Sequence, residues 1–272
     1  MKQQKVKILK NEKVAEGFYR MRVASDYFGS QTSPGQFFEV RCSLSTEPLL
    51  RRPLGAHRIW QGGIEMLYEV VGKGTSLLSA KRAGEDVDII GPLGKGFTVS
   101  EEGDALLVAG GIGVAPLLAL AERINKGADR MSHRKKNIVV IIGAKTRAHV
   151  LCEKEFRLLG CEVLVATEDG SKGKKGLATD ILKNLLFARR LAERAAIYAC
   201  GPTAMLKAVA DIAKAGRMPC QVSLEERMAC GIGVCLGCPV RIKSDVTTAP
   251  SAVLYKMVCK DGPVFNAEDI VW

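Results

Sequence analysis

Apolar positions in the first third of the chain fall into short runs that are separated by turn signals. The turns are Pro34-Gly35, Gly62-Gly63 and Gly91-Pro92, which are typical chain-reversal dipeptides. Runs that are rich in β-branched and aromatic residues predict strands, and several at this spacing predict an antiparallel β-barrel over residues 1–100. The predicted strands are Val6–Leu9, Phe18–Val23, Phe37–Arg41, Glu65–Val71 and Asp86–Ile90.

From Gly103 onward the pattern changes to buried strands that alternate with helical segments. Such alternation predicts an α/β domain with a parallel sheet over residues 101–222, which binds ligands at the carboxyl ends of its strands. The predicted strands are Ala105–Ala109, Ile138–Gly143, Val163–Thr167 and Ala196–Ala199. The predicted helices are Leu117–Ile124, Val150–Leu159, Ala178–Leu191 and Ala204–Ala215.

The last segment, residues 223–272, is organised around four cysteines. Cys230, Cys235 and Cys238 form a C-x4-C-x2-C run, and Cys259 follows after 20 intervening residues. This is the plant-type spacing for a 2Fe–2S cluster, in which four thiolates hold two irons. Glycines inside the run let the backbone wrap the cluster closely. A four-cysteine zinc site and disulfides are the alternatives. Structural zinc usually takes two C-x2-C pairs and this chain has one, and nothing else in the chain suggests an oxidising compartment.

Composition narrows the class of protein. The chain has 272 residues, with 47% hydrophobic and 25% charged, as in an ordinary soluble globular protein. The net charge of +11 suggests anionic partners, but dispersed basic residues and few aromatics argue against nucleic acid. The N-terminus lacks an apolar signal core, and glycines and Pro116 interrupt the longest apolar stretch, residues 105–121. We therefore expect no signal peptide, no membrane segment and a cytoplasmic location, where disulfides are rare.

Two clusters in the predicted barrel have the chemistry of a phosphate site. The Arg51-Arg52-Pro53-Leu54 segment offers guanidinium groups that can grip a pyrophosphate, and Pro53 restricts the backbone. The glycine-rich turn of residues 71–76 runs into a helical segment and offers free N–H groups to a phosphate. Each cluster alone could be a barrel turn or a surface ion pair. Together, ahead of a nucleotide-like domain, they favour a flavin dinucleotide.

The predicted nucleotide domain has glycines at two strand ends. Gly110, Gly111 and Gly113 follow the first strand in a GGxGxxP turn, where the backbone can approach a pyrophosphate. Gly201 and Pro202 follow Cys200, which the pattern places where a nicotinamide ring would lie; a buried structural cysteine is the alternative.

An acidic pair closes the third predicted strand of this domain. Glu168 and Asp169 would accept hydrogen bonds from an adenosine ribose and repel a 2′-phosphate, which favours NAD over NADP. Lys172, Lys174 and Lys175 lie close by and weaken this preference.

The remaining histidines and cysteines show no metal spacing. We expect His57, His133 and His149 at the surface or in loops. Cys220 lies ten positions before Cys230 on a predicted strand, so it is excluded as a cluster ligand. The other cysteines, Cys42, Cys152 and Cys161, behave as small hydrophobic residues.

The order of these parts resembles the ferredoxin–NADP reductase superfamily. The tail SLEERMACGIGVCLGC…CKDGPVF is similar to that of the electron-transfer subunits of NAD-dependent dihydroorotate dehydrogenases. The resemblance implies a 2Fe–2S cluster on the four cysteines of the C-x4-C-x2-C…C pattern. It also implies FAD held by Arg52, Pro53, Leu54, Gly55, Leu67, Tyr68, Glu69, Gly74 and Thr75. One departure is Gly55, where the family usually has a serine, so that backbone N–H groups or Thr75 must replace a hydroxyl.

The resemblance also implies a role and a partner. NADH delivers electrons in pairs and an iron–sulfur cluster carries them singly, so a flavin belongs between the two. The expected function is electron transfer in pyrimidine biosynthesis, with a separate FMN-containing catalytic subunit in a heterotetramer. Leu236, Pro239, Val264 and Phe265 are the predicted apolar contacts. The alternatives are another flavin/iron–sulfur NAD(P)H reductase of the ferredoxin or sulfide type, or a zinc-stabilised, non-catalytic interaction protein.

Overall fold

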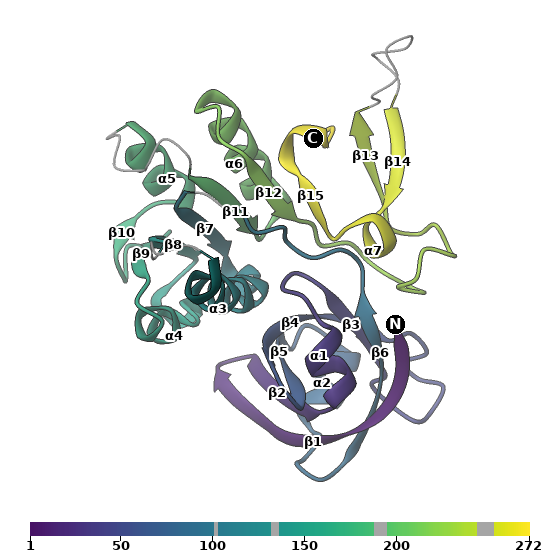
Figure 1. The fold of residues 1–272 in the computed structure, drawn as a ribbon. Helices are drawn as coiled ribbons and strands as arrows, with labels where there is room; N and C mark the ends of the chain where they lie inside the picture. Colours follow the sequence, from purple (N-terminus) through teal and green to yellow (C-terminus); the bar gives the residue numbers. More distant parts are fainter. Residues whose placement is uncertain (101–102, 132–135, 188–194, 244–252) are drawn as a thin grey trace.

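The computed structural model describes residues 1–100, 103–131, 136–187, 195–243 and 253–272. Figure 1 shows three parts: a barrel, a layered domain built on one sheet, and a small lobe that carries the C-terminal hairpin. This architecture confirms the fold class that the sequence predicts. Within the described residues, no helix is both long enough and apolar enough to span a membrane.

Six antiparallel strands close the barrel in the order β1-β2-β5-β4-β3-β6. Alternating apolar residues such as Met21, Phe38 and Ile64 fill its interior. One strand, β4, was missed by the sequence analysis because Pro53, Gly55 and its charged residues break the apolar pattern. The strands are β1 (Lys2–Ala15), β2 (Phe18–Ala24), β3 (Phe37–Val40), β4 (Arg52–Trp60), β5 (Gly63–Glu69) and β6 (Asp86–Leu93). The helices are α1 (Asp26–Gln31) and α2 (Lys73–Ser79).

The second domain is a seven-stranded sheet in the order β10-β9-β8-β7-β11-β12-β15, parallel except for β15. All four predicted strands and all four predicted helices occur, although residues 188–191 of one predicted helix lie outside the described residues. The strands are β7 (Ala105–Gly110), β8 (Ile138–Ala144), β9 (Glu162–Thr167), β10 (Lys174–Lys175), β11 (Ala196–Cys200), β12 (Cys220–Ser223) and β15 (Val264–Asn266). The helices are α3 (Val114–Met131), α4 (Glu153–Leu158), α5 (Ala178–Phe187) and α6 (Thr203–Ala215), with short 3-10 turns at Gly111–Gly113 and Arg147–His149.

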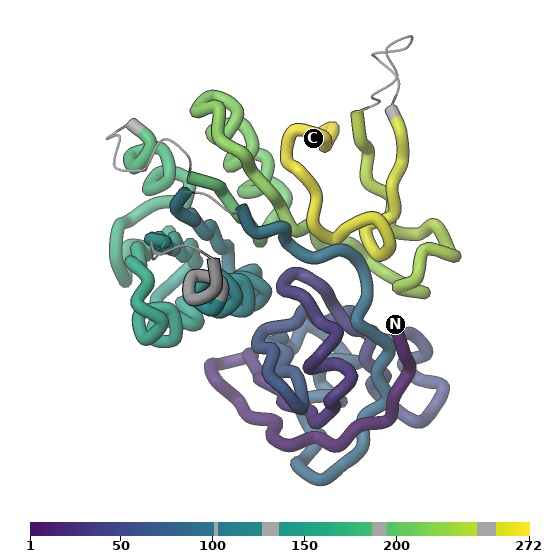
Figure 2. Tube along the Cα trace, in the orientation of Figure 1, coloured from purple at the N-terminus to yellow at the C-terminus, as the bar shows by residue number. Residues whose placement is uncertain are grey.

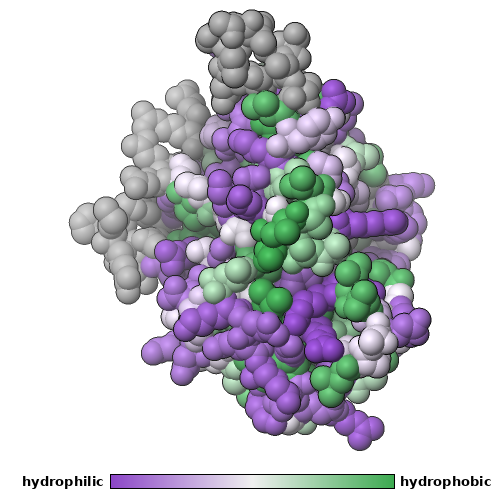
Figure 3. All heavy atoms as spheres, turned by 90° about the vertical axis from the view of Figure 1, so that its right-hand side faces the viewer, coloured by the Kyte–Doolittle hydropathy of each residue, from purple (hydrophilic) through white to green (hydrophobic). Residues whose placement is uncertain are grey.

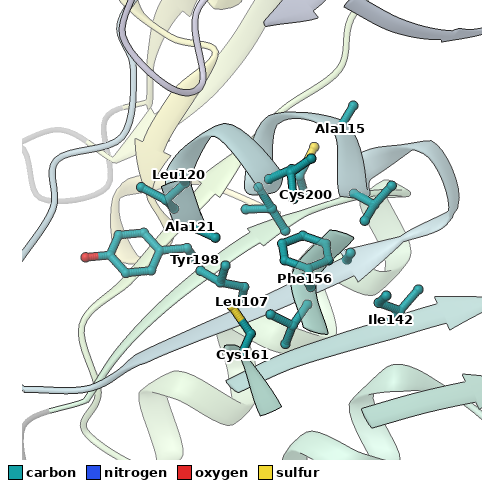
Figure 4. Close-up of a cluster of buried hydrophobic side chains, with 14 of the residues drawn as sticks. Leu107, Ala115, Leu120, Ala121, Ile142, Phe156, Cys161, Tyr198 and Cys200 are labelled. Atoms are coloured by element: carbon teal, nitrogen blue, oxygen red, sulfur yellow. The ribbon is translucent and has the colours of Figure 1, made fainter. Parts of the chain in front are cut away.

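Apolar side chains cover both faces of this sheet, as burial of a parallel sheet requires. Figure 4 shows one of these clusters, in which Leu107, Ile142 and Tyr198 from the strands pack with α3 and with Phe156. Cys200 and Ala115 lie at the same end of the cluster. The end of β11 and the start of α3 are therefore packed together.

The third part is a hairpin of β13 (Pro239–Lys243) and β14 (Val253–Met257), followed by α7 (Val258–Asp261) and a 3-10 turn at Ala267–Asp269. The tail does not stand apart from the sheet, because β15 pairs with β12. Figure 2 traces the connection after β6 as it passes the tail on its way to β7. There Lys95 donates its N–H to the carbonyl of Gly262, and Phe97 donates to that of Pro34. All three parts thus meet at this connection.

Candidate cofactor sites

A cavity of about 370 Å³, called here the barrel cavity, lies where the three parts meet. Most of the residues predicted for FAD line it: Arg52, Pro53, Leu54 and Gly55 from β4, Leu67, Tyr68 and Glu69 from β5, and Thr75 from α2. Its opposite wall comes from α3, the end of β11 and the segment after β12, through Ala115, Pro116, Cys200, Leu224, Glu225 and Met228.

Arg52 is hydrogen-bonded to its own segment and lies against the glycine-rich turn. Its Nη1 donates to the carbonyl oxygens of Leu50 at 2.7 Å and Arg51 at 3.1 Å. A Cβ on Gly74 would lie 2.6 Å from Arg52 Nε, so a larger residue at position 74 would displace the guanidinium group from its present place. The rest of the guanidinium faces the cavity, where it can bind a pyrophosphate. Gly74 therefore leaves room for Arg52, and this cradle fits the predicted flavin.

The missing serine hydroxyl at position 55 has no substitute in Thr75. Thr75 Oγ1 accepts from the backbone N–H groups of Val71 and Gly72 at 3.0 and 3.3 Å and contacts the Gly72 carbonyl at 3.2 Å. That hydroxyl is committed to closing the turn at the start of α2. A side chain at position 55 would meet no atom within 4 Å, so the space for a hydroxyl is present.

A second cavity of about 680 Å³, called here the nucleotide cleft, opens at the carboxyl ends of the parallel strands. Gly110, Gly111, Glu168, Gly201 and Pro202 line it, as predicted. Two other predicted nucleotide-binding residues are placed differently and do not line it. These residues are Gly113 and Asp169.

Gly113 has a packing role in the structure. A Cβ there would lie 2.2 Å from the carbonyl oxygen of Cys200, so glycine allows α3 to begin directly against β11. Asp169 turns back into its own loop, where its carboxylate accepts from the N–H of Ser171 at 2.9 Å and from its Oγ at 2.7 Å. These hydrogen bonds lower the pKa of Asp169. Of the acidic pair, only Glu168 faces the cleft.

Cys200 lines the barrel cavity and is 2% exposed. Burial raises the pKa of its thiol, and the charge of Glu225 raises it further. The thiol is therefore neutral at pH 7, which suits packing against a planar ring better than nucleophilic chemistry.

Glu69 and Glu225 line both cavities, and the sequence analysis missed Glu225. Burial among the cavity walls raises the pKa of Glu225, and the nearby charge of Glu69 adds to this effect. Glu225 nevertheless keeps solvent-exposed surface. Its position two residues beyond β12, at the carboxyl edge of the sheet, was the available sequence signal.

The four cysteines of the tail are joined in two pairs by backbone hydrogen bonds. Cys230 Sγ accepts from the N–H of Cys235 at 3.4 Å, and Cys238 Sγ accepts from the N–H of Cys259 at 3.5 Å. The N–H of Gly233 donates to Cys259 Sγ at 3.1 Å, which links the loop to the second pair. Among the described residues, no three His, Cys, Asp or Glu side chains are grouped as they would be around one metal ion. The two cysteine pairs match a two-iron cluster with four cysteines, because each iron takes two thiolates.

The loop around these cysteines is suited to electron-rich sulfur. Gly231 and Gly233 have φ values of +68° and +82°, in the left-handed region that glycine enters without strain. Burial opposes ionisation of Cys230, but N–H groups of Cys235 and Ile232 outweigh it and lower its pKa to about 6. Cys220, by contrast, lies in β12, and burial raises its pKa to about 12. Burial raises the pKa of Cys259 to about 12, so Cys230 differs from Cys259 in this respect. The spacing of the four tail cysteines and the loop N–H groups that face their sulfur atoms fit a cluster.

The predicted position of His57 was wrong, because this residue is completely buried in β4. His149 lies in the connection between β8 and α4, as predicted, and it lines the nucleotide cleft, where its ring meets Phe18 edge to face. His133 lies outside the described residues. Val264 and Phe265, predicted as docking residues, are only 8% and 7% exposed because β15 packs them into the sheet.

Comparison with known proteins identifies the domains. Residues 225–271 match the iron-sulfur cluster binding domain of dihydroorotate dehydrogenase B, and residues 107–211 match an oxidoreductase NAD-binding domain. The first match supports iron–sulfur over zinc on the tail cysteines.

Several solved structures share the fold. A chain of an NADH-dependent reduced ferredoxin-NADP oxidoreductase, solved in work on flavin-based electron bifurcation, is 31% identical. Its TM-score is 0.83, and the match covers 98% of this chain and 90% of that one. A ferredoxin NADP+ reductase from Neisseria gonorrhoeae, with bound FAD and NADP, shares the fold at 14% identity, with a TM-score of 0.65 and coverage of 79% and 92%.

Curated relatives match along nearly the whole chain. The electron transfer subunit of dihydroorotate dehydrogenase B (NAD(+)) from Desulforamulus reducens is 37% identical over 98% of this chain and 97% of its own length. The subunit of the same name from Geobacillus kaustophilus is 41% identical over 95% of this chain and 94% of its own length. On its domain order, cavities and cysteine loop, and on these matches, the chain belongs to the family of electron transfer subunits of NAD-dependent dihydroorotate dehydrogenase B.

Proposed function

We propose that this chain carries electrons between NAD and a separate catalytic subunit that oxidises dihydroorotate, using FAD in the barrel cavity and a 2Fe–2S cluster on the tail cysteines. One observation carries the proposal. The barrel cavity is lined at once by the barrel, by the sheet edge and by Met228 and Pro263 of the tail. A single flavin site thus touches both the nucleotide domain and the cluster segment.

When bound, FAD exchanges electron pairs with NAD and single electrons with a cluster, which is the chemistry that joins the two. The chain supplies binding and orientation. Arg52 faces the barrel cavity as a pyrophosphate ligand, and Gly110 and Gly111 leave room for the backbone to approach a nucleotide. Cys200 lines the barrel cavity, and Glu225 lines both the barrel cavity and the nucleotide cleft.

The cluster loop provides the docking surface for the catalytic subunit. Ile232, Val234 and Leu236 are 42%, 73% and 65% exposed, and they lie on both sides of Cys235, which is itself exposed. Figure 3 views the molecule from the right-hand side of Figure 1 and shows hydrophobic residues exposed among hydrophilic ones. Three exposed apolar residues within the short segment 232–236 are typical of a surface that contacts another protein. Its occupant is an FMN-containing catalytic subunit, in a cytoplasmic heterotetramer that serves pyrimidine biosynthesis.

Cluster removal tests the proposal on the reconstituted complex. The Cys235→Ser complex should still reduce a small dye with NADH, because the flavin cavity is built from other segments. It should lose electron exchange between NAD and dihydroorotate at least 100-fold. The matched control is Cys220→Ser, which should keep both activities. Normal coupling in the Cys235→Ser complex, after iron analysis confirms loss of the cluster, would show that the cluster lies off the electron path.

A ferredoxin-linked reductase is the second candidate, supported by the 31% identity and TM-score of 0.83 to the ferredoxin-NADP oxidoreductase chain. The partner separates the two functions. We expect the wild-type chain to couple NADH to dihydroorotate chemistry with the catalytic subunit and not to reduce ferredoxin alone. Rapid ferredoxin reduction, with no dihydroorotate coupling in the reconstituted complex, would favour the second candidate.

A further inference from the structure

His57 is completely buried in β4, where the barrel packs against the nucleotide domain. The same strand supplies Arg52, Pro53, Leu54 and Gly55 to the barrel cavity. A buried imidazole has two polar nitrogens and requires partners for them. Its partners show what this side chain does.

The ring joins the flavin strand to the first turn of α3. His57 Nδ1 lies 3.0 Å from the carbonyl oxygen of Ala115, and because a carbonyl only accepts, the nitrogen is the donor. Ala115 and Pro116 line the barrel cavity. Gly110 and Gly111, shortly before α3, line the nucleotide cleft. One hydrogen bond therefore connects the strand at the flavin site to the segment that borders both cavities.

The other side of the ring meets two side chains at longer range. His57 Nε2 lies 3.9 Å from Cys152 Sγ and 3.9 Å from Glu65 Oε1. Burial lowers the pKa of His57 to about 4, and the hydrogen bond to Ala115 opposes this only in part. The ring is thus neutral at pH 7 and keeps its proton on Nδ1. The charged side chains around it are Glu65, Arg58, Arg20 and Glu155.

Ion pairs hold the same domain interface independently of the imidazole. Arg20 Nη1 lies 3.3 Å from Glu155 Oε1 of α4, and Arg58 Nη1 lies 3.2 Å from Glu122 Oε1 of α3. Because these pairs also cross from barrel to nucleotide domain, loss of the His57 hydrogen bond leaves the domains joined. What it removes is the constraint on the first turn of α3.

We propose that His57 is a positioning residue for hydride transfer, which sets the separation of the flavin strand and the nucleotide-binding turn through its hydrogen bond to Ala115. Reacting atoms must be held at contact distance, and a misplacement of about 1 Å can cost about 100-fold in rate. The proposal rests on hydride transfer between NAD and FAD in this chain and not on the identity of the catalytic subunit.

The test compares three variants of the purified, cofactor-loaded chain. His57→Leu fills the space without a donor, His57→Asn keeps a donor near the Nδ1 position, and Cys152→Ala removes a neighbour while leaving the hydrogen bond. Anaerobic stopped-flow gives the rate of flavin reduction at saturating NADH, together with the Kd of NADH. We expect His57→Leu to slow reduction at least tenfold with Kd changed less than twofold. His57→Asn and Cys152→Ala should stay within threefold of wild type.

A second readout does not depend on activity. Hydrogen exchange in the peptide that spans Gly110 and Ala115 should be at least tenfold faster in His57→Leu than in wild type, and restored in His57→Asn. If His57→Leu does not fold, His57→Gln is used in its place. The glutamine amide reaches toward the Nε2 position and not toward Nδ1, so this variant should give the results expected for the leucine variant. Flavin reduction at the wild-type rate in the leucine or glutamine variant, or a His57→Asn variant as slow as either, would refute the positioning role.

Discussion

Selection between NADH and NADPH should depend on Glu168 alone, although the sequence places two carboxylates at this strand end. Glu168 lines the nucleotide cleft, whereas Asp169 is held by two hydrogen bonds from Ser171. We therefore expect Glu168→Gln to weaken the preference for NADH. The matched control, Asp169→Asn, alters the neighbouring carboxylate and should leave the preference unchanged.

The expected magnitude follows from one carboxylate. A hydrogen bond to a charged group contributes about 1.5–3 kcal/mol. The hydrogen bond from the ribose 2′-hydroxyl to the Glu168 carboxylate is lost when a 2′-phosphate replaces that hydroxyl. Lys145 lines the same cleft and would attract that phosphate, so the lower half of the range applies. About 2 kcal/mol corresponds to a preference for NADH of roughly 30-fold. Glu168→Gln should reduce it to less than about fivefold, since the amide still accepts a hydrogen bond but carries no charge.

The assay is kcat/KM for each nucleotide with an artificial dye as acceptor, measured at constant ionic strength because the repulsion is screened by salt. The ratio of the two values is compared among wild type, Glu168→Gln and Asp169→Asn. Equal use of both nucleotides by wild type would refute the reasoning. So would an Asp169→Asn variant whose ratio falls as far as that of Glu168→Gln.

Three further tests, which use five substitutions, address other parts of the structure. Cys235→Ser should lose cluster iron but keep flavin, and Cys220→Ser should keep both; iron analysis showing the reverse would overturn the ligand assignment. Gly113→Ala should lower the free energy of unfolding by about 2 kcal/mol, because the added Cβ would meet a backbone carbonyl at 2.2 Å. The control is Gly55→Ala, whose Cβ would meet nothing within 4 Å and which should not change the midpoint of apo-protein unfolding. Burial lowers the pKa of His57 from about 6.5 to about 4, so between these pH values the folded state binds fewer protons than the unfolded state. The contribution of the neutral imidazole to the free energy of unfolding is therefore complete above pH 6.5 and falls by about 3 kcal/mol as the pH is lowered towards 4. In the His57→Asn variant, the free energy of unfolding measured in urea should decrease less between pH 7 and pH 5 than in wild type. An equal decrease in both proteins would contradict the claim that His57 causes it.

Much of the fold could be predicted from local patterns. The strands at 105–110, 138–144, 162–167 and 196–200 are continuous apolar runs because both faces of a parallel sheet are buried. The glycine turns after the first and last of them could be recognised from composition alone. The cysteine spacing is likewise local, since three of the four predicted ligands lie within nine residues, from Cys230 to Cys238.

Strand β4 and the final strand β15 were not predictable in this way. Pro53 and Gly55 disfavour a strand, yet β4 pairs with β3 and β5 and closes the barrel. Val264 and Phe265 follow the last cysteine and look like surface residues of a small lobe. Their pairing with β12 buries them in the sheet of another domain. In both cases the partner strand outweighs local preference.

The sequence by itself determined the order of the three parts, the parallel sheet with its glycine turns and the spacing of the candidate cluster ligands. Each depends on residues that are close together in the chain, where periodicity and spacing directly express local geometry. Only the tertiary structure decided that His57 is buried against Ala115, that Asp169 turns into its own loop and that Glu69 and Glu225 line the same two cavities. The two residues of each long-range pair are 58 positions or more apart, and the direction of Asp169 depends on the local hydrogen bonds of its turn. The direction of a side chain and its packing across domains produce no periodic pattern in the sequence, because they depend on which surface of the folded protein lies against that side chain.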